Sequence, residues 1–229
     1  MKRIVEPELL DELPPGDPLA VRSRRDLCRV NVWMRNHSIM VETLRNHLNG
    51  RAPEQIIELG AGDGNFLLQV AQNISAPWKH VRVTLLDRKK TVTPQTLASF
   101  TSLGWLAEAV TADVFDWSPA GKPAEVIITN LFLHHFYDMN LARLLRSIAG
   151  HARLFIAIEP RRAPVPWLCS RLLWAIGCNR VTRHDAAVSV RAGFAGAELS
   201  ACWPDKQHWR LTEHPAGPFS HLFIAQRTG

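Results

Sequence analysis

Short, nearly continuous apolar runs recur along this chain and are separated by longer stretches in which apolar positions follow a helical spacing. A run without a polar face predicts a strand that is buried on both sides of a sheet. The strands predicted in this way are residues 55–59, 81–86, a strand that ends just before Asp113, 124–130, 153–159, 198–203 and 221–226. Residues 209–212 are a further candidate for a short strand.

Helical spacing predicts helices between most of these strands. The helices expected are 23–48, 64–74, 94–102, one capped by Asp138, an apolar one over 164–179 and one that a capping box at 182–185 opens. Strands that alternate with helices predict a parallel sheet with helices on both faces. The last two strands have no helix between them, so we expect an antiparallel end to the sheet.

The first long helix has one irregular position. Its apolar stripe runs through Leu27, Val30, Met34, Val41, Leu44 and Leu48, and His37 stands where one more apolar residue would complete it. Three interpretations remain open: His37 packs half-buried, the helix breaks at 36–38, or the segment covers a ligand pocket with Asn36 or His37 facing it.

Length and composition fit one α/β domain with an addition. The chain has 229 residues, of which 46% are hydrophobic. We expect residues 1–50 to be a leader with a helical cap and 51–229 to be the domain, with 1–20 extended because prolines and acidic residues alternate there. No stretch approaches the roughly 18 apolar residues of a membrane span, and no signal peptide is apparent. The four cysteines lack zinc spacing, so we expect reduced thiols, no metal site and a cytoplasmic protein.

The net charge of +6 is concentrated in two arginine-rich stretches, 21–52 and 143–191. Arginine makes planar, bidentate contacts with phosphate, so a nucleic acid is an alternative partner. A solvated basic surface explains the same pattern more simply.

A glycine-rich turn follows the first predicted strand. The sequence from Glu58 to Gly64 reads E-L-G-A-G-D-G, with glycines at Gly60, Gly62 and Gly64. A dinucleotide fingerprint would place its third glycine at position 65, which is Asn65, and Glu58 would repel a pyrophosphate. A carboxylate at this place favours a cationic ligand.

This turn resembles motif I of class I methyltransferases, which use S-adenosylmethionine (SAM). The resemblance covers about residues 52–229 and implies a Rossmann-like α/β fold: a seven-stranded, mostly parallel sheet with an antiparallel last strand. It also implies a set of cofactor-binding residues at the ends of the first four strands: Glu58, Gly60, Ala61, Gly62, Gly64, Asn65, Asp87, Arg88, Asp113, Val114, Asn130 and Leu131.

Two of these residues carry specific expectations. Asp87 at the end of the second strand would accept hydrogen bonds from the ribose hydroxyls, and the alternative is that it caps the next helix or turn. Asp113 would accept from the adenine amino group while Val114 covers the ring, and the alternative for Asp113 is an Asx turn.

Histidines follow the fourth strand. Residues 131–136 read L-F-L-H-H-F and resemble the segment found in small-molecule methyltransferases of the ubiquinone and menaquinone type. Methyltransferases of DNA or RNA amino groups carry a proline pair here, which this chain lacks. Strand ends flank the ligand crevice of an open sheet, so we expect His135 first and His134 second as a general base.

Other residues are candidates for the acceptor's pocket: His37, Glu159, Arg162 and His184, with Arg161 beside them. Glu159 could instead orient a histidine, and each of the others has a purely structural interpretation. The apolar segment 164–179 favours a hydrophobic acceptor if it is a lid rather than a core helix.

The sequence therefore predicts methyl transfer from SAM to an oxygen, or less readily a carbon, of a small aromatic or polyketide-like metabolite. An RNA methyltransferase is the alternative, and a binding module that lost the chemistry is a third class. An NAD oxidoreductase conflicts with Glu58 and Asn65. The sequence gives no indication of the oligomeric state.

Overall fold

The computed structural model describes residues 1–14, 16–74, 78–119 and 123–228. Its centre is a seven-stranded sheet in the order β3-β2-β1-β4-β5-β7-β6. The strands are β1 (Gln55–Leu59), β2 (Arg82–Asp87), β3 (Leu106–Thr111), β4 (Ala124–Asn130), β5 (Ala152–Pro160), β6 (Trp209–Ala216) and β7 (Ser220–Arg227). Strands β1 to β5 are parallel, and β7 lies antiparallel between β5 and β6. This topology confirms the predicted fold.

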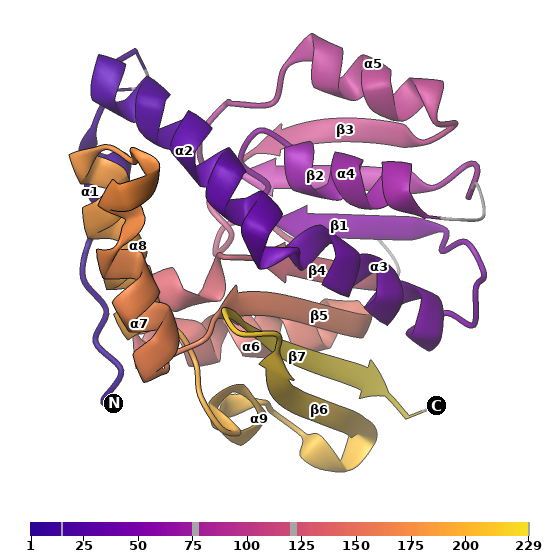
Figure 1. Cartoon of the computed structure of the whole chain (residues 1–229). Coiled ribbons are helices and arrows are strands. Elements are labelled where there is room, and N and C mark those ends of the chain that lie inside the picture. The colour runs from indigo at the N-terminus through magenta and orange to yellow at the C-terminus, as the bar shows by residue number, and fades with distance from the viewer. Residues whose placement is uncertain (15, 75–77, 120–122, 229) are drawn as a thin grey trace.

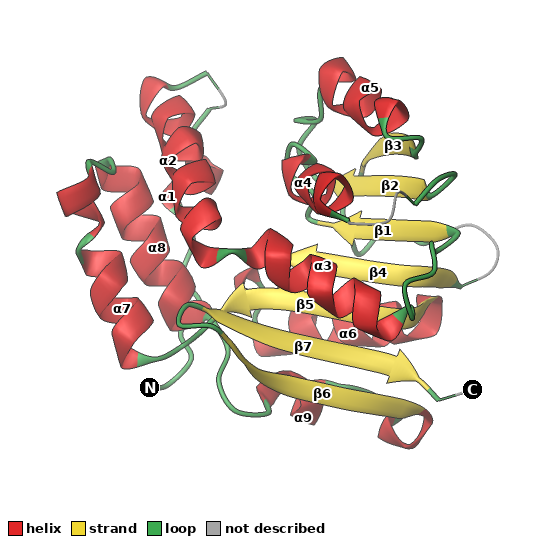
Figure 2. Cartoon of the chain, turned by 45° about the vertical axis from the view of Figure 1, so that its right-hand side comes forward, coloured by secondary structure: helices red, strands yellow, loops and turns green. Residues whose placement is uncertain are grey.

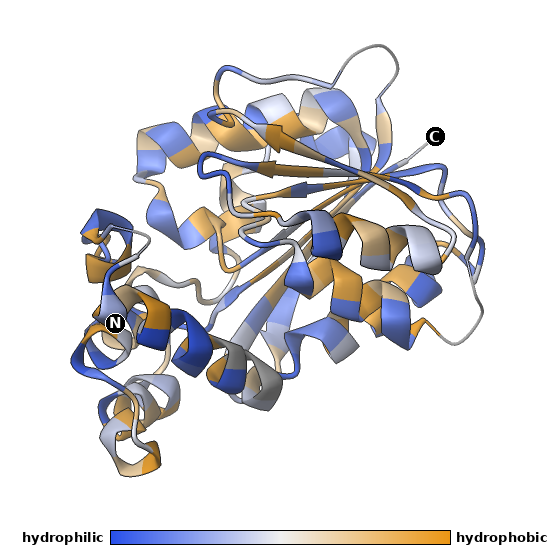
Figure 3. Cartoon of the chain, turned by 90° about the horizontal axis from the view of Figure 1, so that it is seen from above, coloured by the Kyte–Doolittle hydropathy of each residue, from blue (hydrophilic) through white to orange (hydrophobic). Residues whose placement is uncertain are grey.

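Two hydrophobic layers hold helices against the sheet (Figure 2). One layer receives α3 (Asn36–His47), α4 (Asn65–Asn73) and α5 (Pro94–Ser102), and the other receives α6 (Asp138–His151) and α9 (Glu198–Cys202). Figure 3 shows hydrophobic positions along the central strands, while the helices carry both hydrophobic and hydrophilic positions. Each helix thus buries one apolar stripe against the sheet.

The remaining helices form a cap beside the edge at which the parallel strands end (Figure 1). They are α1 (Leu9–Glu12), α2 (Pro18–Met34), α7 (Pro164–Arg171) and α8 (Arg180–Ala192), and α1, α2 and α7 all contact α8. Among the described residues, 3₁₀ turns lie at Leu133–His135, Leu173–Ile176 and Lys206–His208. In the described ranges, no helix has both the length and the apolar character needed to span a membrane.

The predicted strand at 198–203 is wrong, because this segment forms α9. Glu198 accepts the N–H of Ala195 in the turn before α9. Two of the first N–H groups of α9 itself, those of Leu199 and Ser200, donate to the carboxylate of Glu213. These bonds satisfy donors that a helix leaves unpaired at its start. The sheet edge is instead the β6–β7 hairpin, so the candidate at 209–212 belongs to a full-length strand.

The predicted helix over 23–48 is two helices. Arg35 has a left-handed backbone (φ 56°) and separates α2 from α3, so the break comes one residue before the predicted one. The chain changes direction there, and α2 leaves the sheet to join the cap (Figure 1). The leader is not wholly extended either, since α1 interrupts it and α2 begins at Pro18.

Three further boundaries differ from prediction. The segment 164–179 is not one helix, because α7 stops at Arg171 and a 3₁₀ turn follows. The helix α8 opens at Asn179, whose side chain accepts the N–H of Thr182, so the capping residue precedes the predicted box. Asp138 is not the cap of α6, because it is the first residue of that helix and Tyr137 stands at the cap position. Its carboxylate binds Arg3 at 3.0 Å.

Candidate functional site

A cavity of about 660 Å³ lies where the parallel strands end. Its walls come from the leader, α2, the glycine turn and the segments after β2, β3 and β4. Its lining includes Val5, Glu6, Pro7, Glu8, Leu10, Asp11, Arg24, Leu27, Gly60, Gly62, Asp63, Asp87, Arg88, Lys89, Asp113, Val114, Leu131, Phe132, His135, Phe136 and Tyr137. Carboxyl ends of parallel strands are where open α/β sheets bind ligands.

The glycine turn needs its glycines for two different reasons. Gly60, Gly62 and Gly64 all have positive φ, which other L-residues adopt at a cost. A Cβ at Gly60 would lie 2.2 Å from the ring of Phe132, and one at Gly64 would lie 2.8 Å from Leu85. A Cβ at Gly62 would meet nothing within 4 Å, because Gly62 lines the cavity. Gly62 thus presents bare backbone to a ligand.

Asp87 both organises this turn and lines the cavity. Its Oδ2 accepts the N–H of Gly62 at 2.8 Å, and its Oδ1 accepts the N–H of Lys89 at 2.8 Å. It caps no helix, because Thr93 is the cap of α5. Asp87 therefore caps the turn. This is compatible with a ligand-facing role, since a carboxylate oxygen accepts more than one hydrogen bond.

Asp113 shows the same combination. Its Oδ1 accepts the N–H of Phe115 at 2.9 Å, which closes the Asx turn that the sequence left open. Asp113 and Val114 nevertheless both line the cavity, beside Arg88.

Glu58, at the end of β1, is buried without a full set of partners. Its side chain is 2% exposed, and its Oε2 has no hydrogen-bond partner among the described residues. Burial, together with the charges of Asp63 and Asp87, raises the pKa of Glu58 well above its ordinary value. An orphaned carboxylate oxygen is costly unless a cation or donor pairs with it.

The other predicted cofactor residues occupy varied places. Leu131 lines the cavity with a left-handed backbone (φ 53°), whereas Ala61 and Gly64 are buried beneath the turn. Asn65 is exposed, and its side chain binds Asp63 rather than the cavity. Asn130 accepts from Asn36 at 2.8 Å, and Asn36 in turn accepts from Ser220 at 2.6 Å. Asn36 thus ties α3 to the end of β4.

Glu159, at the end of β5, holds the histidine segment in place. Its carboxylate accepts the backbone N–H groups of Phe132 (3.1 Å), Leu133 (2.8 Å) and His134 (3.3 Å). Its Oε2 also lies 2.8 Å from Nδ1 of His134. Glu159 is completely buried, so it orients a histidine and does not contact the cavity.

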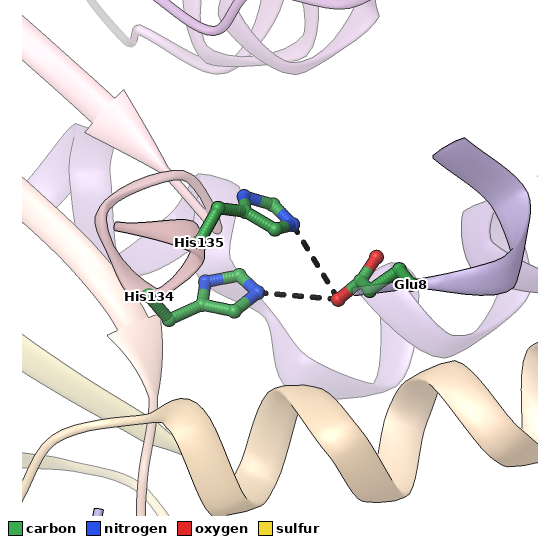
Figure 4. Close-up of side chains that lie close together, drawn as sticks. All are labelled: Glu8, His134 and His135. Carbon is green, nitrogen blue, oxygen red and sulfur yellow. Dashed lines mark hydrogen bonds and ion pairs between the residues drawn. The ribbon is translucent and has the colours of Figure 1, made fainter. Parts of the chain in front are cut away.

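The two histidines converge on one carboxylate from the leader (Figure 4). Nε2 of His134 and Nε2 of His135 each lie 3.4 Å from Oε1 of Glu8. Nδ1 of His135 is 3.1 Å from the carbonyl oxygen of Phe132. His134 is 3% exposed and His135 is 33% exposed, and only His135 and Glu8 of the three line the cavity.

Charge within this cluster shifts two pKa values. Burial lowers the pKa of His134, but hydrogen bonds and charges of Glu159 and Glu8 outweigh burial and raise it to about 9. Burial raises the pKa of Glu8, yet the two histidines hold it well below its usual range. The cluster therefore stabilises positive charge opposite Glu8.

Sequence reasoning missed Glu8 because no spacing connects it to residues about 126 positions away. A network of contacts fixes the leader across α8. Arg3 binds the carbonyl oxygens of Ala192, His134 and Phe136, and Asp185 accepts the N–H groups of Leu9 and Leu10. Ser189 also donates to Oε1 of Glu8. The leader is therefore a wall of the cavity.

The remaining predicted acceptor residues lie outside the cavity lining. His37 contacts Ser38, and His184 contacts Asp185. Arg162 is buried and binds Gly193 and Glu198, while Arg161 pairs through its backbone with Phe219. The apolar segment around α7 exposes Val165, Leu168, Leu172 and Trp174 on the surface instead of lining the cavity.

Comparison with known proteins identifies the domain. Residues 56–153 match the family described as "Methyltransferase domain". This match covers part of the chain, and the whole sheet has the class I methyltransferase topology. SAM is the methyl donor of that class. Comparison with curated proteins gave no match.

Solved structures share the fold at low sequence identity. The plantazolicin methyltransferase BpumL in complex with SAH is 14% identical with a TM-score of 0.66, covering 93% of this chain and 92% of that one. Magnesium protoporphyrin IX methyltransferase (ChlM) from Synechocystis PCC 6803, with bound SAH, is 12% identical with a TM-score of 0.56, covering 96% and 91%. An O-methyltransferase family protein from Burkholderia thailandensis is 17% identical with a TM-score of 0.58, covering 93% and 61%.

Two features of the methyltransferase site suit this donor. The open backbone of Gly62 leaves room for a close approach within the cavity. The orphaned oxygen of Glu58 is an acceptor beside the glycine turn, although Glu58 is buried and is not part of the cavity lining. Asp87 and Asp113 add carboxylate acceptors along the same wall. SAM carries an ammonium, a sulfonium, ribose hydroxyls and an adenine amino group, so its donors and charges match these acceptors.

Proposed function

We propose that the enzyme transfers the methyl group of SAM to an oxygen atom of a small, largely apolar metabolite. The observation that carries this proposal is that one cavity joins Gly62, Asp87 and Asp113 to His135 and Glu8. Cofactor-type groups and a titratable cluster thus border the same space. A cavity of about 660 Å³ lies within the range of roughly 300–1,000 Å³ that is typical of small-molecule sites.

On the cofactor side, Gly62 and Asp87 would bind the ribose, and Asp113 and Val114 would hold the adenine. Arg88 and Leu131 complete this wall. Glu58, buried behind the cavity lining, would compensate the positive charge of the donor from there. When bound, SAM supplies a methyl group already activated by its sulfonium, so the chain must mainly align the acceptor and remove its proton.

On the acceptor side, His135 is the first candidate base and His134 the second. His135 lines the cavity. In the tautomer whose Nδ1 donates to the Phe132 carbonyl, Nε2, which faces Oε1 of Glu8 at 3.4 Å, is the atom that accepts a proton. The acceptor hydroxyl gives up this proton, its oxygen forms the bond to carbon, and the sulfur keeps the electron pair of the broken carbon–sulfur bond. His134 is buried behind His135, which weakens its claim to direct contact.

The acceptor's chemical class follows from the rest of the lining. Val5, Pro7 and Leu10 of the leader, Leu27 of α2 and Phe136 after β4 present apolar surface. These side chains favour an aromatic or polyketide-like acceptor over a strongly hydrated one.

An RNA acceptor is the second candidate, because Arg24, Arg88 and Lys89 line the cavity. Phosphate contacts predict an affinity that falls steeply with salt. Binding of RNA that is tight at low salt, steeply salt-dependent and followed by methyl incorporation would favour it over the metabolite.

The proposed function is tested with the purified full chain, isotope-labelled SAM and a metabolite extract, with the product identified by mass spectrometry. We expect a labelled small molecule with the methyl group on oxygen. Asp87→Ala should weaken SAH binding at least about tenfold, because a bidentate carboxylate contact is worth about 1.5–3 kcal/mol. Asp116→Ala, an exposed acid outside the cavity, is the matched control. If the wild-type chain does not bind SAH, the proposal is overturned.

A further inference from the structure

The Glu8–His134–His135 cluster has a geometry that paired hydrogen bonds do not explain well. A charge-assisted N–H···O⁻ bond is about 2.7–2.9 Å long, yet both Nε2···Oε1 distances are 3.4 Å. The three ligand-type atoms all lie within 4.8 Å of one another. These contacts are therefore long, weak hydrogen bonds or ion pairs, and the same spacing suits three groups that share a cation.

We propose that Glu8, His134 and His135 form a binding site for Zn²⁺, with Oε1 of Glu8 and Nε2 of each histidine as ligands. Two histidines and one glutamate, with a fourth position left for water or substrate, are a known ligand set of catalytic zinc. Zinc–ligand distances of about 2.0–2.2 Å give a tetrahedron whose edges are about 3.3–3.5 Å. Both measured edges to Glu8 match that length.

The atoms behind the ligands support the same assignment. A metal-binding histidine usually donates its other ring N–H to a carboxylate or a backbone carbonyl, which fixes the ring and leaves the ligating nitrogen unprotonated. Nδ1 of His134 has such a partner in Glu159 at 2.8 Å, and Nδ1 of His135 has one in the carbonyl of Phe132 at 3.1 Å. Ser189 donates to Oε1 and fixes the carboxylate of Glu8. Each of the three ligands is thus oriented by a further contact.

The position of the site indicates its use. Glu8 and His135 line the cavity proposed to hold the acceptor, so a cation here would border that space. Zinc lowers the pKa of bound water to about 7, and it would lower that of a coordinated hydroxyl in the same way. This catalytic role rests on the proposed function, whereas metal binding itself does not. It also changes the role of His135, because a nitrogen that ligates zinc cannot serve as the base.

The binding test uses the full chain without a polyhistidine tag, stripped with chelator and titrated with Zn²⁺ by calorimetry. We expect one ion per chain, and we expect Co²⁺ in the same site to give the intense visible absorption of four-coordinate cobalt. His135→Ala and Glu8→Gln should each weaken Zn²⁺ binding by at least about tenfold. His208→Ala and Glu12→Gln, exposed residues outside the cavity, are the matched controls and should bind as the wild type does.

Several results would overturn the zinc site: no stoichiometric Zn²⁺ binding, equal affinity in all four variants, or a six-coordinate Co²⁺ spectrum. Calorimetry with SAH separates this inference from the proposed function. Zn²⁺ binding without SAH binding would support the metal site while the proposed function fails, and SAH binding without Zn²⁺ binding would do the reverse. Full methyl transfer by the stripped chain would exclude the catalytic role of zinc and leave His135 as the base.

Discussion

Oε2 of Glu159 lies 2.8 Å from Nδ1 of His134, and the two side chains are 0% and 3% exposed. The same carboxylate collects three consecutive backbone N–H groups from residues 132–134. One acid at the end of β5 therefore fixes both the loop after β4 and the ring that reaches Glu8. The reactive cluster depends on Glu159 although that residue never meets the cavity.

Glu159→Gln should destabilise the fold strongly. The amide NH₂ would face the backbone N–H groups that now donate to the carboxylate, and His134 would lose its anionic partner. Breaking a buried ion pair on one side costs about 3–5 kcal/mol. Urea unfolding measures the change. Glu42→Gln, an exposed residue of α3, is the control and should stay within about 0.5 kcal/mol of wild type. A Glu159→Gln protein of wild-type stability would contradict the role given to this carboxylate.

Gly62→Ala should weaken SAH binding more than it weakens the fold. Its Cβ would enter open space in the cavity, so the folding cost is the left-handed backbone alone, about 1–2 kcal/mol. Gly217→Ala is the matched control, since it has φ 74°, no atom within 4 Å and a place in the β6–β7 turn. The melting temperature should fall by a similar amount in both variants. Only Gly62→Ala should lose affinity for SAH, by at least about tenfold. Equal SAH affinity in the two variants would contradict a close approach of the cofactor to the backbone of Gly62.

Gly60→Ala should behave differently from Gly62→Ala. Its Cβ would lie 2.2 Å from the Phe132 ring, so overpacking of about 1–3 kcal/mol adds to the backbone cost. The expected result is a clearly lower melting temperature than that of Gly62→Ala. A double variant with Phe132→Ala tests the cause, because removing the ring should relieve part of the added loss.

Glu213 should make the stability depend on pH in acid. Burial raises the pKa of Glu213, but hydrogen bonds from His221, Ser200 and Leu199 outweigh burial and hold it below the ordinary value of about 4.5. Because the folded pKa is the lower one, this carboxylate stabilises the fold fully above about pH 4.5 and loses that contribution as pH falls through its folded pKa. Urea unfolding at a series of pH values measures this slope. Glu213→Gln should show a flatter slope there, and an unchanged slope would contradict the assignment.

Arg3→Ala should weaken the attachment of the leader to the domain. The Arg3 side chain donates to three backbone carbonyl oxygens and to the carboxylate of Asp138. Hydrogen bonds to charged groups contribute about 1.5–3 kcal/mol, so amide exchange at Ile4, Leu9 and Leu10 should quicken at least about tenfold. Hydrogen exchange with mass spectrometry measures this, and Lys2→Ala, an exposed neighbour, is the control. Unchanged exchange would mean that Asp185, together with Arg191, whose carbonyl accepts from Ile4 and whose guanidinium binds Glu6, holds the leader without Arg3.

The sequence by itself determined the sheet and the glycine turn. Apolar runs placed six of the seven strands, and Gly60 to Gly64 marked the ligand edge, because both signals depend on neighbours close in the chain. One strand prediction failed. Residues 198–203 are apolar enough for a strand, yet the carboxylate of Glu213 in β6 satisfies N–H groups of a short helix there. Such long-range partners leave no trace in local spacing.

Only the tertiary structure decided how the reactive side of the cavity is built. The sequence named His134, His135 and Glu159, but it could not say that Glu159 binds three backbone donors or that His134 lies behind His135. It gave no sign of Glu8, because an extended, proline-rich leader has no periodicity that states where it docks. The position of the leader is determined by its contacts with α8 and by the bonds of Arg3 to backbone carbonyl groups, all of which lie far away in the chain. Those contacts bring the carboxylate of Glu8 to the two histidines.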